Sequence, residues 1–397
     1  MPTQWIPPDP GQLPEWRSQM LDHLASTPAM MTMREALRAG RSTIVPTVPG
    51  LDVSEASDGA VILTRSERDR LERAELYYAT PDMTALALAA AQTPPTEPVS
   101  LRRLPAPAGL IVFGEPIGGY TEDAAQALAG TLAHRPGASA LITTPIVAVS
   151  WSEWSPDAVR LDQGARVRWT FKSRAGSGTI PDGWRGAWLT FWSPRGMFSG
   201  LDPAHVIGTT RDGFVMTAGD IDAHRETGGP PLGWDNEMLI AEGKPFGPAE
   251  PDTTASWAHV LYTAFQLMSQ DQGRNRWTDT QEVPRARAGA KRDARQGIQG
   301  SGAVRIVNVH SAHRPPAGAA QDDVQASTGR REPQWSCRWP VRPYRRFTCL
   351  NPSAHADGGC QHEDRIVPGH IKGPQDAPLR TGERVTLWDH QPTEATS

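Results

Sequence analysis

Apolar and polar residues alternate with two different periods along this chain, and each period predicts a different kind of element. Between Asp252 and Gln270, apolar side chains recur every three or four residues, which predicts an amphipathic helix packed on a sheet. Over residues 165–172 apolar and polar residues alternate one by one, as in a half-buried strand. Similar patterns predict further helices at 15–25, 30–39, 66–79, 81–91 and 122–133, and further strands at 109–115, 140–150, 187–193 and 213–218. The predicted fold class is therefore α+β, with a helical N-terminal region, a central mixed sheet and its packed helix, and a small β-rich C-terminal module.

Prolines, glycines and basic residues interrupt these patterns and predict the domain boundaries. A proline-rich stretch cannot continue a helix, and a stretch rich in arginine and glycine is typical of an exposed connector. The final part shows short strand patterns near 303–309, 334–346, 365–372 and 384–389. We expect five parts: a helical N-terminal region (1–92), a Pro-rich linker (93–107), a central α+β domain (108–270), a basic linker (271–300) and a β-rich basic C-terminal module (301–397).

Composition limits the classes of function without selecting one. The 397 residues carry a formal net charge of -4, so any surface for nucleic acid or acidic lipid must be local. Residues 1–10 lack a basic segment followed by an apolar run, and the most apolar stretch, 138–151, is too short to span a bilayer. Three cysteines cannot form a disulfide framework. These features predict a cytoplasmic protein with no membrane partner.

All three cysteines lie within 24 residues of one another, close to two histidines. Thiolates and imidazoles suit Zn²⁺, which asks only for a tetrahedral arrangement. The predicted ligands are Cys349, His355, Cys360 and His362, with Cys337 able to replace any of them. Because the spacing is not a standard Cys-x2-Cys pair, a loop with free thiols and surface histidines stays open as the alternative. A zinc ion bound here is predicted to be structural.

A basic and aromatic segment lies beside this cluster. Arginine contacts phosphates and aromatic rings stack on bases, so their interleaving is typical of a nucleic-acid interface. The predicted binding residues are Arg338, Trp339, Arg342, Tyr344, Arg345 and Arg346, with DNA favoured over RNA as the partner. The alternative is a strand whose aromatic residues face inward and whose arginines are solvated.

Carboxylates in the central part allow a second hypothesis. Asp235 precedes Glu242-Gly243-Lys244, which resembles the arrangement of nucleases that hold a divalent ion with two carboxylates and orient water with a lysine. If the segment before it is extended, alternation places a further set of candidate ligands on one side: Asp220, Asp222, His224 and Glu226. Solvated loop charges remain the default interpretation, and no catalytic residue is assigned.

Six of the fourteen tryptophans fall within residues 151–192. Large aromatic side chains dominate cores, and several of these lie on predicted strands. Core packing is therefore favoured over a ligand-stacking wall.

The C-terminal stretch from Trp335 to Leu379 resembles the tail of uncharacterised proteins from high-GC Gram-positive bacteria, some on mobile elements. The resemblance rests on a Trp/Arg-rich strand, Trp335-Ser-Cys-Arg-Trp-Pro-Val-Arg, and on the segment Lys372-Gly-Pro-Gln-Asp-Ala-Pro-Leu. No activity is assigned to that group, so the resemblance implies no catalytic residues. Many of its members lack the cysteines and histidines, which implies a structural role for any zinc.

The sequence thus predicts a nucleic-acid-binding protein with a zinc-stabilised C-terminal module. Two alternatives stay open: a metal-dependent nuclease with its site in the central domain, and a non-catalytic protein whose tail binds a protein partner.

Overall fold

The computed structural model divides the chain into two units, Met1–His313 and Arg314–Ser397, and each unit is described by itself. The residues that it describes are 5–48, 55–93, 97–123, 132–134, 141–159, 166–173, 176–195, 202–220, 223, 230–269, 278–309, 338–341, 344–349, 362–367, 370–374 and 377–378.

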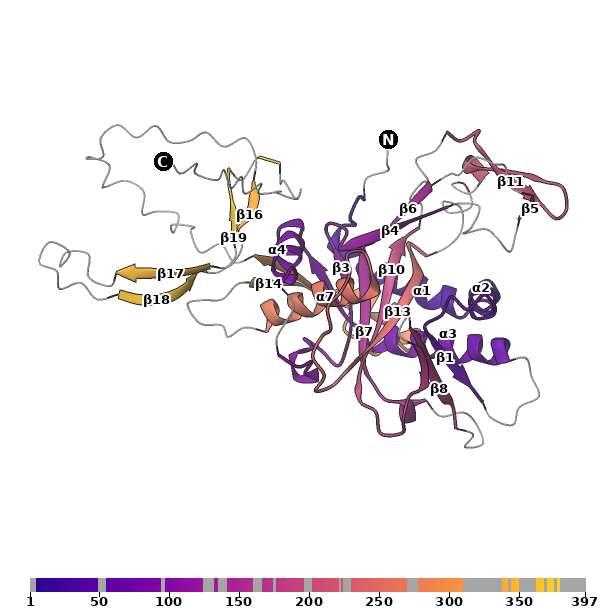
Figure 1. Ribbon diagram of the computed structural model, residues 1–397, viewed down its shortest axis with the longest axis horizontal. Helices are drawn as coiled ribbons and strands as arrows, with labels where there is room; N and C mark the ends of the chain where they lie inside the picture. The colour runs from indigo at the N-terminus through magenta and orange to yellow at the C-terminus, as the bar shows by residue number, and fades with distance from the viewer. Residues whose placement is uncertain are drawn as a thin grey trace, which may run out of the picture. The chain divides into compact units, whose positions relative to one another are not determined.

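A seven-stranded mixed sheet forms the centre of the first unit (Figure 1). Its strand order is β13 (Leu232–Ala241), β10 (Gly186–Pro194), β7 (Ala148–Trp154), β3 (Ala108–Phe113), β2 (Glu75–Ala79), β15 (Val304–Val309) and β14 (Thr278–Val283). The pairs β3–β2 and β2–β15 are parallel, and all the other neighbours are antiparallel. The predicted α+β class with a central mixed sheet is confirmed.

The central strand β3 is buried on both faces, and its alternate residues belong to two different cores. Ile111 and Phe113 pack with α4 (Pro81–Ala91) and α7 (Thr254–Met268). Leu110 and Val112 pack on the other face with α1 (Leu13–Leu24). Because both faces are covered, this strand is a continuous apolar run rather than an alternating one. The first unit is therefore a helix–sheet–helix sandwich.

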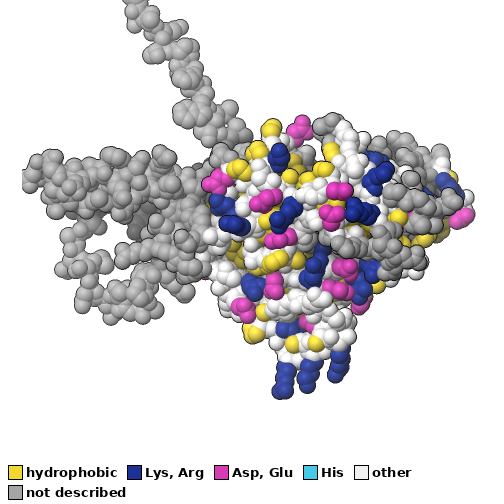
Figure 2. Space-filling view, turned by 90° about the horizontal axis from the view of Figure 1, so that it is seen from below, with side chains coloured by type: hydrophobic (Ala, Val, Ile, Leu, Met, Phe, Trp, Pro, Cys, Tyr) yellow, Lys and Arg dark blue, Asp and Glu magenta, His cyan; other side chains and the backbone are white. Residues whose placement is uncertain are grey.

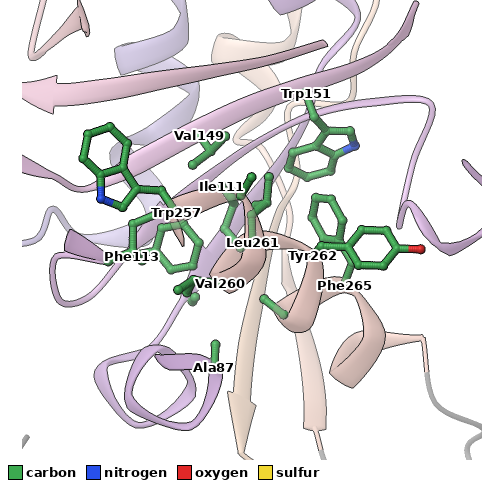
Figure 3. Packing of buried hydrophobic residues seen from close by; sticks show 14 of the residues in the cluster. Ala87, Ile111, Phe113, Val149, Trp151, Trp257, Val260, Leu261, Tyr262 and Phe265 are labelled. Carbon is green, nitrogen blue, oxygen red and sulfur yellow. The ribbon is translucent and has the colours of Figure 1, made fainter. Parts of the chain in front are cut away.

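Helix α7 follows the predicted apolar stripe, and Figure 3 shows its side chains against the sheet. A reciprocal capping box of Thr253 and Ser256 starts it, which satisfies two backbone donors at its amino end. The ring centroids of Phe265 and Trp151 lie 4.7 Å apart, and the Tyr262 hydroxyl accepts from the Ser100 amide at 2.8 Å. The helix expected at 252–270 is confirmed.

The described residues of the first unit also form three smaller sheets. The strands β1 (Ile44–Thr47), β8 (Arg168–Ser173) and β9 (Gly176–Thr179) form the first, and β12 (Val215–Thr217), β11 (Val206–Thr210) and β5 (Leu132–His134) form the second. The third pairs β4 (Gly118–Asp123) with β6 (Leu141–Ile146). The remaining helices are α2 (Thr27–Arg38), α3 (Glu55–Arg73) and α8 (Arg287–Arg295), with 3-10 turns at Pro10–Gln12, Leu101–Arg103 and Pro156–Ala158.

The tryptophan-rich stretch is a core, as expected. Trp154 packs edge-to-face on Trp169, Trp184 and Trp188, with ring centroids 5.2–5.5 Å apart. Each edge-to-face pair of this kind stabilises the fold by about 0.5–1.5 kcal/mol in addition to the effect of the area that it buries. Met33 of α2 and Leu63 of α3 complete this cluster, so it joins the small β1–β8–β9 sheet to the helices.

A buried ion pair fixes α3 to the sheet. Glu67 is fully buried and accepts hydrogen bonds from Ser150 of β7 and Thr190 of β10, each at 2.7 Å. Its partner is Arg70, one helical turn later, whose Nε donates to Glu67 Oε2 at 3.1 Å. The Arg70 guanidinium also lies 4.3 Å above the ring of Trp188. Burial lowers the pKa of Arg70, and the attraction of Glu67 opposes that shift.

A second buried arginine joins α1 to α8. Arg17 is fully buried, and its Nη1 donates at 2.6 Å to the carbonyl of Ala74, the residue before β2. Its Nη2 lies 3.9 Å from Oδ2 of the buried Asp293 in α8, and Arg285 donates to the other oxygen of that carboxylate at 3.2 Å. Burial lowers the pKa of Arg17 to about 10.

The predicted domain boundaries differ from the structure in three places. The strand β2 lies before the Pro-rich stretch 93–107 and pairs with β3 after it, so residues 1–92 and 108–270 build one sheet. The strand at 304–309, assigned to the C-terminal module, is β15 of that same sheet. The expected basic linker at 271–300 contains β14 and α8, two regular elements of the first unit.

Several element predictions also change. The helix expected at 66–79 ends at Arg73, and Glu75–Ala79 is the strand β2 of the central sheet, which its two tyrosines and its two parallel neighbours favour. The ends of the helix expected at 122–133 belong to β4 and β5, and residues 124–131 lie outside the described part. The expected strand at 140–150 is two strands, β6 and β7. The expected strand at 384–389 lies outside the described residues.

The described residues on the face of the molecule in Figure 2 form no large area in which the charged side chains are all of one sign. Acidic and basic side chains are interspersed there, apart from a few Lys and Arg side chains that project together at its lower edge. Among the described helices, none is long and apolar enough to cross a membrane.

We expect Glu67→Gln to lower the free energy of unfolding by about 3–5 kcal/mol, because it leaves the buried Arg70 charge without its partner. Because glutamine has nearly the same shape as glutamate, the loss of stability measures the effect of removing the charge. Denaturant titration followed by tryptophan fluorescence measures it.

The matched control is Glu35→Gln on α2, whose carboxylate pairs with Arg38 at 3.0 Å while both side chains are at least half exposed. Exposed pairs are worth about 1 kcal/mol or less. A Glu67→Gln effect no larger than that of the control would contradict the assignment of Glu67 as the anchor of α3.

Candidate functional site

The described residues of the C-terminal unit form two antiparallel strand pairs. Strand β16 (Trp339–Val341) pairs with β19 (His370–Lys372), and β17 (Tyr344–Cys349) pairs with β18 (His362–Val367). Val341 pairs with His370 in the first of these sheets, and Tyr344 pairs with Val367 in the second. The two sheets are labelled β16 to β19 in Figure 1, and we refer to them together as the ribbon β16–β19.

The register brings together two of the four predicted zinc ligands. Cys349, the last residue of β17, is the direct partner of His362, the first residue of β18. Directly opposed residues of an antiparallel pair have Cα atoms only about 4.5–5.5 Å apart. His355 and Cys360 belong to the connection between these strands and lie outside the described residues, as does Cys337. All four predicted ligands therefore belong to one end of the ribbon or to the segment that joins its strands.

The predicted nucleic-acid residues divide between the two strand pairs. Trp339 belongs to β16, and Tyr344, Arg345 and Arg346 belong to β17. Arg342 lies outside the described residues.

Arg338, at the base of the ribbon, has a structural contact. Its backbone amide donates to the Pro378 carbonyl, and its Nε donates to the Ala377 carbonyl, both at 2.9 Å. This arginine ties the ribbon to the segment that carries the Ala-Pro-Leu sequence.

Sequence reasoning missed one residue of the site. Arg365 on β18 is the direct partner of Arg346 on β17. Like charges at directly opposed positions destabilise an antiparallel pair, so this arrangement is unfavourable unless something neutralises it. The signal was present in the sequence as a basic residue in an expected strand, but only the register of the ribbon places it opposite Arg346.

The central carboxylates do not form the predicted nuclease arrangement. Asp235 lies in the first half of β13 and Glu242 directly follows its end. Seven residues of extended chain at about 3.4 Å each separate them by more than about 20 Å. Glu242 instead accepts from the Leu101 amide at 2.6 Å, and Asp235 accepts from the Tyr120 hydroxyl at 2.9 Å. Two carboxylates so far apart cannot hold one metal ion.

The expected set around Asp220 also differs from its prediction. Residues 218–220 are helical rather than extended, so alternation does not apply to them. Asp220 accepts from the amide and the hydroxyl of Thr217 at 2.8 and 2.7 Å, which lowers its pKa. Asp222, His224 and Glu226 lie outside the described residues. Among the side chains that are described, no three His, Cys, Asp or Glu residues group so that they could hold a metal ion.

Comparisons of this chain with protein-family profiles, with curated proteins and with solved structures found no match.

Proposed function

We propose that this protein binds duplex DNA through the ribbon β16–β19. The observation that carries the proposal is the direct pairing of Arg346 with Arg365. In the free protein, like charges at opposed positions lower the stability of the strand pair. An anionic partner that binds both arginines would remove this repulsion and add charge-assisted hydrogen bonds.

The shape of the ribbon supports the same partner. The major groove of B-form DNA admits a two-stranded antiparallel ribbon, whereas the major groove of A-form RNA is too deep and narrow for side chains to read. Several DNA-binding proteins use such a ribbon in place of a helix. The geometry thus favours DNA over RNA, as the sequence does.

Local charge supports it as well. Whereas the whole chain has a net charge of -4, residues 338–372 carry six basic residues against three acidic ones: Arg338, Arg342, Arg345, Arg346, Arg365 and Lys372 against Asp357, Glu363 and Asp364. The excess of positive charge is local, which is the pattern expected of a phosphate-binding surface on an acidic protein.

A structural zinc ion at the end of the ribbon is part of the proposal. Cys349 and His362 are direct partners, so one thiolate and one imidazole start from neighbouring positions. His355 and Cys360 lie between them in the sequence. The four residues together supply two thiolates and two imidazoles, which is a ligand set that a tetrahedral zinc site uses. A metal at this end fixes the connection between the strands, and so presents Arg346 and Arg365 in one register.

Binding of duplex DNA should depend steeply on salt, and Arg346→Gln/Arg365→Gln should weaken it. Each phosphate contact adds about 0.9 to the slope of log K against log salt, so the double variant should lower that slope by about 2. Fluorescence anisotropy of a labelled 20-base-pair duplex with the full chain, over a salt series, measures both quantities.

The control for this test is Arg34→Gln/Arg38→Gln on α2, which removes the same charge from a helix where Glu35 neutralises it. This variant should bind DNA as the unchanged protein does. Thermal unfolding of the Arg346/Arg365 variant should be unchanged or higher, since it removes a like-charge pair. Equal salt slopes for all three proteins would contradict the proposal.

The metal part of the proposal has its own prediction. Elemental mass spectrometry of protein purified under reducing conditions should find about one zinc per chain, and Cys349→Ser/Cys360→Ser should lose it. Zinc binding contributes to folding free energy, so a chelator should raise amide hydrogen exchange in residues 338–372 first.

Cys337→Ser is the control, because it removes a thiol of the same region without removing one of the four proposed ligands. Its zinc content should stay near one per chain. A double variant that keeps its zinc, or an unchanged protein that contains none, would contradict the metal site and leave the DNA test unaffected.

A further inference from the structure

A cavity of about 300 Å³ lies in the first unit between the helices α1 and α2 and the strand β13. Its volume is at the lower end of the range of small-molecule sites, and most of its wall is apolar, as in such sites. The apolar wall includes Met20, Leu24, Met33, Trp192, Leu232 and Trp234. The ring centroids of Trp192 and Trp234 lie 6.2 Å apart with the rings tilted by 49°, so this side of the cavity offers aromatic surface to an apolar group.

Three cationic or titratable nitrogen groups line this cavity: His23 of α1, Arg41 after α2, and Arg195 after β10. Arg41 is exposed and makes no ion pair among the residues that the structure describes. His23 is half-buried, and burial together with the nearby Arg195 charge lowers its pKa. The environment of His23 is therefore one that disfavours a further positive charge.

Both carboxylates at the cavity already accept hydrogen bonds from the protein. Glu237 is buried, and its Oε1 accepts from the Ser42 hydroxyl at 2.7 Å and from the amides of Thr43 and Ile44 at 2.8 and 3.1 Å. Its Oε2 accepts from the indole of Trp234 at 3.1 Å. This carboxylate is thus a structural anchor for β1, and its charge is spread over several donors.

Asp235, the second carboxylate, lies at a β-bulge. Phe191 of β10 pairs with Asn236 and Trp192 pairs with Trp234, which leaves Asp235 as the extra residue of β13. A β-bulge changes the direction in which a side chain points, and bulges are frequent next to active sites. Here the bulged residue lines the cavity and accepts from the Tyr120 hydroxyl at 2.9 Å.

From this arrangement we infer that the cavity binds a small organic anion with a flat apolar body. The apolar body lies against Trp192 and Trp234, and the anionic group binds at the Arg41, Arg195 and His23 end. Neutral donors of the protein already fill the acceptor sites of Glu237, whereas Arg41 makes no ion pair among the described residues and can pair with an anionic ligand. This inference concerns the first unit and stands independently of the DNA-binding ribbon.

Calorimetric titration of the full chain with naphthalene-2-sulfonate tests the inference, with 2-naphthalenemethanol as the uncharged analogue of similar shape. The anion should bind at one site per chain, and the alcohol at least about tenfold more weakly, since it lacks a charge-assisted hydrogen bond. Arg41→Gln should weaken the anion by a similar factor and leave the alcohol unchanged.

Two further variants separate the cavity from nonspecific binding. Ala36→Trp, a half-buried position on the cavity wall, should abolish binding of both compounds by filling the space. Arg38→Gln, on the same helix but not on the wall, should bind as the unchanged protein does. Circular dichroism should show the same fold for each variant. Equal affinity for the anion and the alcohol, or undiminished binding by Ala36→Trp, would overturn the inference.

Discussion

The fold of the first unit depends on one buried carboxylate. Glu67 joins α3 to two neighbouring strands of the central sheet, through Ser150 and Thr190, and neutralises Arg70 beside it. Burying an ion pair is costly, and only a full set of hydrogen bonds makes it tolerable. That requirement specifies where α3 lies along the sheet. The position of α3 in turn places α2 and the tryptophan cluster, and with them the wall of the cavity.

The C-terminal ribbon obeys a different constraint. A two-stranded ribbon buries little apolar surface, and an isolated hairpin is marginally stable in water. Like charges at directly opposed positions, such as Arg346 and Arg365, are unfavourable in an antiparallel pair. Under our proposal, a metal ion at the Cys349–His362 end supplies stability without a core, and DNA neutralises the opposed arginines. Under this proposal both features that weaken the free ribbon have a function.

Local sequence patterns were sufficient for elements whose own periodicity decides their structure. Helices α4 and α7 and strand β3 were predicted within two residues of their observed ends, because an apolar stripe or run marks each of them. Strand β2 was missed because its apolar residues continue the helical pattern of α3, and only pairing with β3 and β15 makes it a strand. Strand β13 was missed because the two prolines before it and the glycine near its start favour a loop. The arginine pair and the cavity join residues from separate segments, which no local pattern reveals.

The most direct test of the proposed function is amide hydrogen exchange of the full chain, with and without a 20-base-pair DNA duplex, followed by mass spectrometry. The account predicts that DNA slows exchange in residues 338–349 and 362–372 and leaves α4 and α7 unchanged. Protection confined to residues 1–313, or no protection at saturating DNA, would contradict it.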